Sequence, residues 1–176
     1  VDETGFYPLY LSRGILLEAA IVAGHLAEQA GAVKRVVQVL RADDETARAG
    51  AAALRRHLTA QGIATEERRL ETAAPIDARA FDAAPADALV LWLRADDLQR
   101  LDAVNPVPAS VYLSAMLADL ERAPLPAAWK ARALMASPYE LPQNREARTA
   151  QLNAWLKAHA LSPVDDPVQA DAYIAY

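Results

Sequence analysis

The sequence predicts an α/β fold, a three-layer sandwich around a mostly parallel central sheet. Short apolar and β-branched runs alternate about four times with stretches of helical periodicity, which is typical of consecutive βα units. The apolar runs are nearly continuous, as strands buried on both faces require. With 176 residues and 53% apolar content, we expect a single α/β domain over residues 1–176.

The first half of the chain predicts two helices and two strands. A helix over 14–29 has Ser12 as its candidate N-cap and an apolar stripe that we expect to be buried. The stripe consists of Ile15, Leu16, Ala19, Val22, Ala23 and Leu26. A β-branched strand over 33–40 follows, then a helix over 47–61 that Gly62 ends, and a polar strand over 63–70 that we place at a sheet edge.

The second half repeats the alternation. The predicted elements are a short helix over 77–83, a central strand over 88–93, a helix over 96–103, a strand over 110–113, a helix over 116–122 and a strand over 133–136. An amphipathic helix over 144–159 is expected to bury Leu152, Trp155 and Leu156, and a last helix over 166–176 leaves Tyr173 and Tyr176 uncovered. The strands near Val36, Leu91 and Tyr112 are expected to be central and parallel, a flavodoxin-like arrangement.

Composition excludes several classes of function. The net charge of -5 and pI of about 5.2 provide no basic face for nucleic acid. The absence of cysteine excludes disulfides, thiolate metal sites and cysteine nucleophiles. No apolar run approaches the roughly 18 to 20 residues that cross a bilayer, so we expect no membrane insertion. Because the chain begins at Val1, we expect it to be processed or excised from a longer one.

Two similar strings follow two different strands, Arg41-Ala42-Asp43-Asp44 and Arg94-Ala95-Asp96-Asp97. In an open parallel sheet, ligands meet the loops at the carboxyl ends of the strands. The aspartates suit helix N-caps better than direct ligand contacts. Each arginine could bind a carboxylate or phosphate, or pair with a neighbouring aspartate, and the sequence leaves both open.

Signatures of catalysis and of cofactors are missing. The chain has no Gly-rich phosphate loop and no serine flanked by glycines in a nucleophile elbow. His25, His57 and His159 fall in separate predicted helices without a second histidine at metal-ligand spacing. Trp92, Trp129 and Trp155 suit core or rim positions. We therefore expect a non-catalytic protein without a cofactor or metal.

Five stretches carry a resemblance to a known family. They are Tyr10-Leu11-Ser12-Arg13-Gly14 before a helix, the strand–loop–helix–strand segment from Lys34 to Ile63, Ala86-Asp87-Ala88-Leu89-Val90-Leu91, Val111-Tyr112-Leu113-Ser114, and the segment from Asp166 to Tyr176. Together they resemble the second lobe of the Leu/Ile/Val-binding branch of the type 1 periplasmic binding proteins, and the resemblance runs over most of this chain. Amino-acid binders of that branch offer an aromatic residue after the first strand of this lobe and an acid after the fourth, where this chain has Thr46 and Ser114-Ala115-Met116.

The resemblance implies a periplasmic solute receptor of an ABC transporter that encloses a small ligand, amino-acid-like or a small carboxylate, between two lobes. Residues 1–13 and 163–176 would be hinge segments. The implied partners are the missing first lobe and an ABC permease. The implied ligand-binding residues are Ser12, Arg13, Ala42, Asp43, Leu93, Arg94, Ala95, Ser114 and Met116. Within this set, we expect Arg94 and Ser114 to line one wall of the cleft.

Two alternatives belong to other classes. Asp43-Asp44 after one strand and Ser114-Ala115 after another are similar to a receiver-like phosphorylation domain, although Leu91-Trp92-Leu93 offers no phosphoacceptor aspartate and no lysine follows the strand over 133–136. The other alternative is a binding-protein lobe that has lost its ligand and serves as a docking module.

Overall fold

The computed structural model describes residues 14–29, 33–71, 76, 78–81, 87–103, 110–119, 125–138, 150 and 153–161. Contacts divide the chain into two compact units, Gly14–Pro138 and Val1–Arg13 with Tyr139–Tyr176. The first unit carries the sheet. In the second, the described part contains a helix over 153–158. The predicted hinge segments lie outside the described residues, and the single domain over 1–176 stays a prediction.

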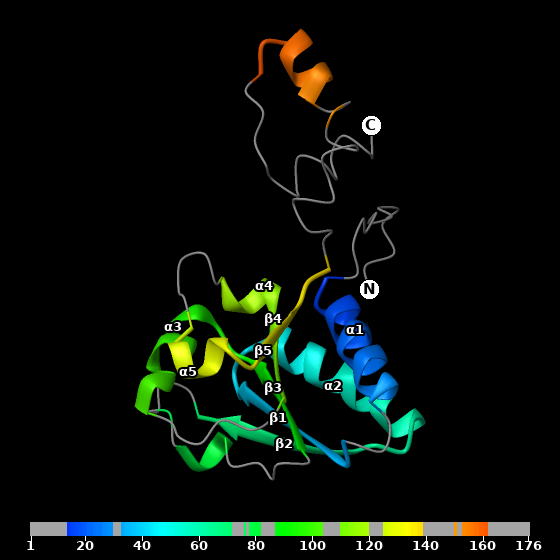
Figure 1. Cartoon of the computed structure of the whole chain (residues 1–176), viewed down its shortest axis with the longest axis vertical. Helices are drawn as coiled ribbons and strands as arrows, with labels where there is room; N and C mark the ends of the chain where they lie inside the picture. The colour runs from blue at the N-terminus through cyan, green and yellow to red at the C-terminus, as the bar shows by residue number, and fades with distance from the viewer. Residues whose placement is uncertain are drawn as a thin grey trace, which may run out of the picture. The chain divides into compact units, whose positions relative to one another are not determined.

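The core of the first unit is a five-stranded, all-parallel sheet in the order β2-β1-β3-β4-β5 (Figure 1). Its strands are β1 Arg35–Arg41, β2 Ala64–Leu70, β3 Asp87–Trp92, β4 Ser110–Ser114 and β5 Ala133–Ala136. The predicted α/β fold is confirmed, as are the central, parallel positions of the strands near Val36, Leu91 and Tyr112. The polar strand β2 lies at an edge, as its composition predicts.

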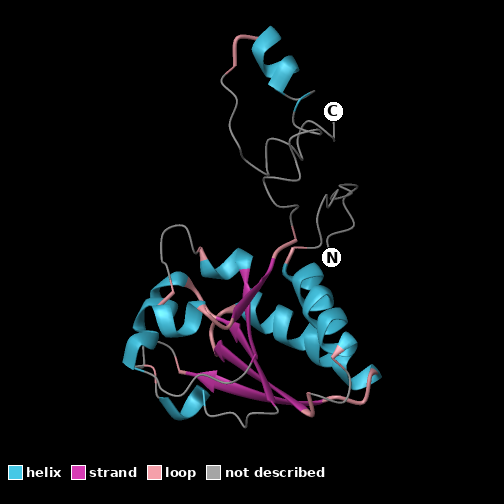
Figure 2. Ribbon diagram, in the orientation of Figure 1, coloured by secondary structure: helices cyan, strands magenta, loops and turns pink. Residues whose placement is uncertain are grey.

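Helical segments cover both faces of the sheet (Figure 2). Helices α1 Ile15–Glu28 and α2 Glu45–Ala60 pack together on one face. The other face is covered by short segments, the 3-10 helices η1 Ala78–Phe81 and η2 Gln99–Ala103 and the helices α3 Ala95–Leu98 and α5 Ala127–Lys130. Helix α4 Ala115–Ala118 follows β4 directly. This three-layer arrangement is consistent with a flavodoxin-like fold.

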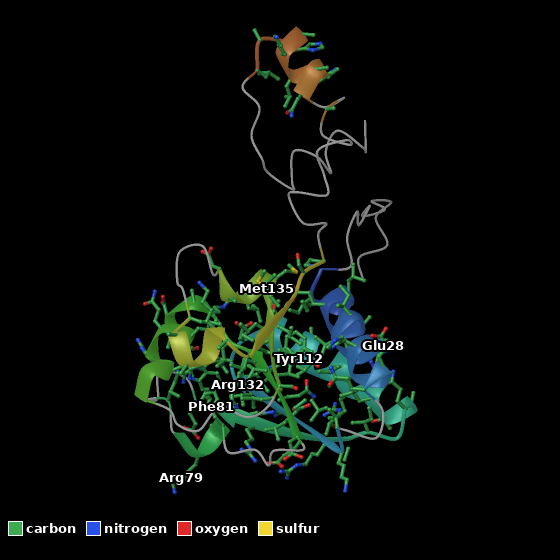
Figure 3. All side chains as sticks on the ribbon, viewed as in Figure 1. Glu28, Arg79, Phe81, Tyr112, Arg132 and Met135 are labelled. Atoms are coloured by element: carbon green, nitrogen blue, oxygen red, sulfur yellow. The ribbon has the colours of Figure 1, made fainter. Side chains whose placement is uncertain are left out.

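Alternation along the strands builds one hydrophobic cluster on each face. In β1, Val36 and Leu40 pack toward α1 and α2, while Val37 and Val39 pack toward the opposite layer. Figure 3 shows Phe81 and Glu28 on opposite sides of the sheet. Burying each such aliphatic side chain contributes about 1.5 to 3 kcal/mol, so the doubly buried strands account for much of the stabilisation.

The two edge strands differ in character. Strand β2 carries ion pairs across its surface, including Arg35–Glu66 at 2.8 Å, Arg68–Glu66 at 2.7 Å and Arg55–Glu67 at 2.7 Å. Charged side chains on an edge strand oppose pairing with another chain. Strand β5 instead exposes Leu134 and Met135 by nearly half of their surface.

Four details of the sequence prediction are wrong. The N-cap of α1 is Gly14 and not Ser12, with a φ of 49° that a glycine adopts without strain. Leu16 is 42% exposed and does not belong to the buried stripe. The buried positions lie 3, 4 and 7 residues after Ile15, and the first of these is Glu18. The helix predicted over 116–122 ends at Ala118, since Asp119 adopts a left-handed conformation with φ 40°.

The fourth is Trp155, which is 39% exposed, whereas its neighbour Leu156 is buried as predicted. Trp92 and Trp129 are core residues, as predicted. Leu152 and the helix predicted over 166–176 lie outside the described residues.

Gly50 allows α2 to pack closely against α1 and β3. A Cβ added at Gly50 would lie 2.8 Å from Ile15 Cγ1 and 2.9 Å from Trp92 Cζ3. Both neighbours are buried in the core. The backbone of α2 at Gly50 therefore packs directly against the Trp92 ring, and a larger residue at this position would displace the side chains of Ile15 and Trp92.

We predict that Gly50→Ala lowers the free energy of unfolding by about 1 to 3 kcal/mol, because overpacking outweighs the gain in helix propensity. Gly24→Ala in α1 is the matched control, since nothing lies within 4 Å of the added Cβ. It should raise stability by about 0.5 to 1 kcal/mol. Urea denaturation of both variants measures the two effects, and changes of the same sign would contradict the packing argument.

Candidate functional site

A cleft of about 520 Å³ opens at the carboxyl ends of β1 and β3. The chain leaves β1 toward β2 on one side and returns to β3 on the other side, so this is the point where the strand order reverses. Crevices at such switch points are where open α/β sheets bind ligands. The lining residues are Arg41, Asp43, Asp44, Glu45, Thr46, Trp92, Arg94, Asp96, Asp97 and Arg100.

Asp44 fixes the loop between β1 and α2. Its Oδ1 accepts a hydrogen bond from the Ala47 backbone N–H at 3.0 Å, so it is the N-cap of α2. Two residues earlier, the Ala42 N–H donates to the Leu70 carbonyl at 2.9 Å and extends the pairing of β1 with β2. The loop is thus held at both ends, which confirms a cap role for Asp44.

The two Arg-Ala-Asp-Asp strings exchange ion pairs across the cleft. Arg41 binds Asp97 with two parallel hydrogen bonds, Nη2 to Oδ1 at 2.6 Å and Nε to Oδ2 at 3.1 Å. Arg94 in return donates from Nε to Asp44 Oδ2 at 2.6 Å. In each pair, the first residue of one string meets the last residue of the other. We call these two contacts the reciprocal pairs.

The reciprocal pairs differ in burial. The side chains of Arg41 and Asp97 are 12% and 11% exposed, and the hydrogen bond that Asp97 accepts from Arg41 raises the pKa of Arg41. Arg94 is 62% exposed. Burial alone would raise the pKa of Asp44, but hydrogen bonds from Arg94 and the Ala47 N–H outweigh it and lower that pKa. The first pair is structural, whereas the second is accessible to a ligand.

Trp92 is the aromatic residue of the cleft. Its indole Nε1 donates to Gln38 Oε1 at 2.8 Å, and the ring packs beneath Gly50. Gln38 is fully buried, and its Nε2 has no hydrogen-bond partner among the described residues. Trp92 is therefore held in one orientation from both sides.

The remaining charged residues of the cleft are exposed. Asp43, Glu45 and Asp96 provide three carboxylates outside the reciprocal pairs, against the single guanidinium of Arg100. The free charge of the lining is therefore negative.

The structure brings two of the proposed ligand-binding residues, Asp43 and Arg94, into this cleft. Ala42, Leu93 and Ala95 belong to the same two loops, but they do not line the cleft, and Leu93 is buried in the core. Ser114 and Met116 are likewise not among its lining residues. Ser12 and Arg13 lie outside the described residues.

Ser114 instead belongs to a buried polar cluster with Glu18. Ser114 Oγ donates to Glu18 Oε2 at 2.5 Å and also caps α4 by accepting from the Leu117 N–H at 3.2 Å. Glu18 Oε1 accepts from the Met116 N–H at 3.0 Å. Desolvation by burial raises the pKa of Glu18, and the hydrogen bonds from Ser114 and Met116 oppose that rise without cancelling it. This cluster ties the first turn of α1 to the end of β4.

Sequence reasoning did not assign Arg41, Asp44, Asp97 or Trp92 to the ligand site. The repeated Arg-Ala-Asp-Asp string was the signal for the first three, because identical strings after two adjacent parallel strands can face each other. Trp92 gave no such signal, since a tryptophan at the end of an apolar strand is usually a core residue.

Comparison of the sequence with known protein families finds no matching family, and comparison with curated proteins finds no match. In the part of the chain that the structure describes, no three or more His, Asp or Glu side chains gather so as to hold a metal ion. None of the helices described there has the length and apolar character to cross a membrane.

We predict that Asp97→Asn lowers the free energy of unfolding by about 2 to 4 kcal/mol, because it removes the carboxylate charge that binds the largely buried guanidinium of Arg41 through two hydrogen bonds. The adjacent, exposed Asp96→Asn should change stability by no more than about 0.5 kcal/mol. Chemical denaturation of both variants at neutral pH gives the comparison. Equal losses would show that the buried pair does not hold the two loops.

The raised pKa of Glu18 predicts a pH-dependent stability. Between the ordinary glutamate pKa and the higher folded value, the folded state binds more protons than the unfolded state, so stability falls as pH rises through this window. Glu18→Gln removes this contribution, and the variant should therefore gain stability relative to the wild type from pH 4 to pH 7. Denaturation across that range measures the difference, with the exposed Glu28→Gln on the same helix as control. A difference that does not change with pH would contradict the assignment.

Proposed function

We propose that this chain is a non-catalytic lobe that binds a small, amino-acid-like molecule as part of an ABC-transporter solute receptor. The observation that carries the proposal is the polar cleft at the switch point between β1 and β3, about 520 Å³ in volume. Ligand cleft volumes are typically about 300 to 1,000 Å³. The resemblance to type 1 periplasmic binding proteins supports a periplasmic location, a second lobe and a permease as further parts of the proposal.

The lining of the cleft supports binding rather than chemistry. Its two partly buried carboxylates, Asp44 and Asp97, both form ion pairs with arginine. Arg94 meets Asp44 through Nε alone, so its terminal nitrogens have no hydrogen-bond partner in the described part of the chain. Residues that are anchored at one atom and available at others suit ligand recognition.

The receiver-like alternative has less support. A receiver needs free carboxylates beside the first strand, whereas Asp44 caps α2 and pairs with Arg94.

The affinity of this chain alone for a ligand should be weak, because the proposed site has a second wall on the other lobe. Each lost neutral hydrogen bond costs about 0.5 to 1.5 kcal/mol, so the loss of four or five moves a micromolar binder to about millimolar.

We predict that amino acids and small organic ions at about 1 to 20 mM shift the backbone amide NMR resonances of residues 42–46 and 93–100 in this chain, without a thermal shift at sub-millimolar concentration. Thr46→Tyr should abolish the resonance shifts, because it fills the cleft from the first turn of α2. Thr59→Tyr, at the exposed far end of the same helix, is the matched control and should not affect them. If no compound shifts the cleft resonances, or if Thr46→Tyr leaves the shifts intact, the proposal is wrong.

A further inference from the structure

The α2 N-terminus and Arg94 together form the part of the cleft that would attract an anion. The first N–H groups of a helix carry partial positive charge and bind anions, and arginine binds carboxylates. In this structure both already have an anionic partner. Asp44 accepts from the Ala47 N–H at 3.0 Å with Oδ1 and from Arg94 Nε at 2.6 Å with Oδ2.

This carboxylate is well held. Its side chain is only 10% exposed, and its position is fixed because the residue is also the cap of a 16-residue helix. The hydrogen bonds that it accepts lower its pKa, so it remains charged at neutral pH. A ligand anion would therefore have to displace the Asp44 carboxylate, which is part of the chain itself, from Arg94 and the Ala47 N–H.

The other two arginines of the cleft do not offer an anion a replacement for the site that Asp44 already fills. Arg41 is bound to Asp97 through two nitrogens and donates a third hydrogen bond, from Nη1, to the Glu71 carbonyl at 2.6 Å. Outside the reciprocal pairs, the lining has three exposed carboxylates and one exposed guanidinium, that of Arg100. An anion entering the cleft therefore meets a net repulsive field, and a cation meets an attractive one.

We propose that Asp44 acts as a built-in anion that makes the cleft select cationic ligands, such as amines, over carboxylates. This inference rests on the proposed function, because it names the ligand class of the same cleft. It assigns Asp44 the role of a specificity-determining residue in addition to its role as a helix cap. Charge selectivity is then set by the chain itself and not by the other wall of the site.

Three probes of equal length test the proposal: butane-1,4-diamine, the neutral butane-1,4-diol and succinate. Titrated into the full 176-residue chain at low salt and neutral pH, the diamine should shift the resonances of residues 42–46 and 93–100. Its dissociation constant should be at least about tenfold lower than those of succinate and the diol.

Asp44→Asn removes the charge but keeps an oxygen that caps α2, so the fold is retained. This variant should bind succinate about tenfold or more tightly than the wild type does, because the guanidinium of Arg94 is then no longer neutralised by a carboxylate at position 44. Glu28→Gln is the matched control, since it removes the same charge from an exposed position that does not line the cleft. It should improve succinate binding by less than about threefold.

Each outcome decides the question. A wild-type preference for succinate, or equal binding of diamine and diol, would overturn the charge selectivity and leave the proposed binding function standing. An equal gain from Glu28→Gln would show that the net charge of the chain, rather than the position of Asp44, controls selectivity. If none of the three probes shifts the cleft resonances, and the amino acids also fail, the proposed function falls together with this inference.

Discussion

The exchange of ion pairs between two adjacent strand ends is the constraint on which the site depends. Each string provides an arginine at its first position and an aspartate at its last, and each residue finds its partner in the other string. Because β1 and β3 are parallel neighbours, their ends lie at the same edge of the sheet. The pairs therefore fix the separation of the loops, the start of α2 and the walls of the cleft together.

The same chemistry has two different consequences because burial differs. Between Arg41 and Asp97, water is largely excluded, and loss of one partner leaves a charge that the interior cannot solvate. Between Arg94 and Asp44, the guanidinium lies mostly in water, and such a pair contributes about 0 to 1 kcal/mol to stability. One pair can hold the scaffold while the other remains free to respond to a ligand.

Much of the fold could be predicted from the sequence, because continuous β-branched runs indicate buried parallel strands and a polar run such as β2 indicates an edge. The site was less predictable. Ser114 lies at a strand end, where a ligand contact was expected, but it binds Glu18 instead. Helical spacing places Glu18 in the core, whereas its charge would predict a position at the surface. The partners of Arg41 and Arg94 depended on the distance between two loops, and single-sequence patterns do not contain that distance.

The environment of Trp92 also makes its fluorescence a reporter of the cleft. A buried indole whose N–H is bonded to an amide oxygen senses a fixed local field, and Trp92 also lines the charged cleft. The chain has three tryptophans, of which Trp129 is buried in the opposite layer and Trp155 is partly exposed. With those two replaced by phenylalanine, the fluorescence of the remaining tryptophan would come from the cleft alone, and its wavelength would report occupancy without any added label.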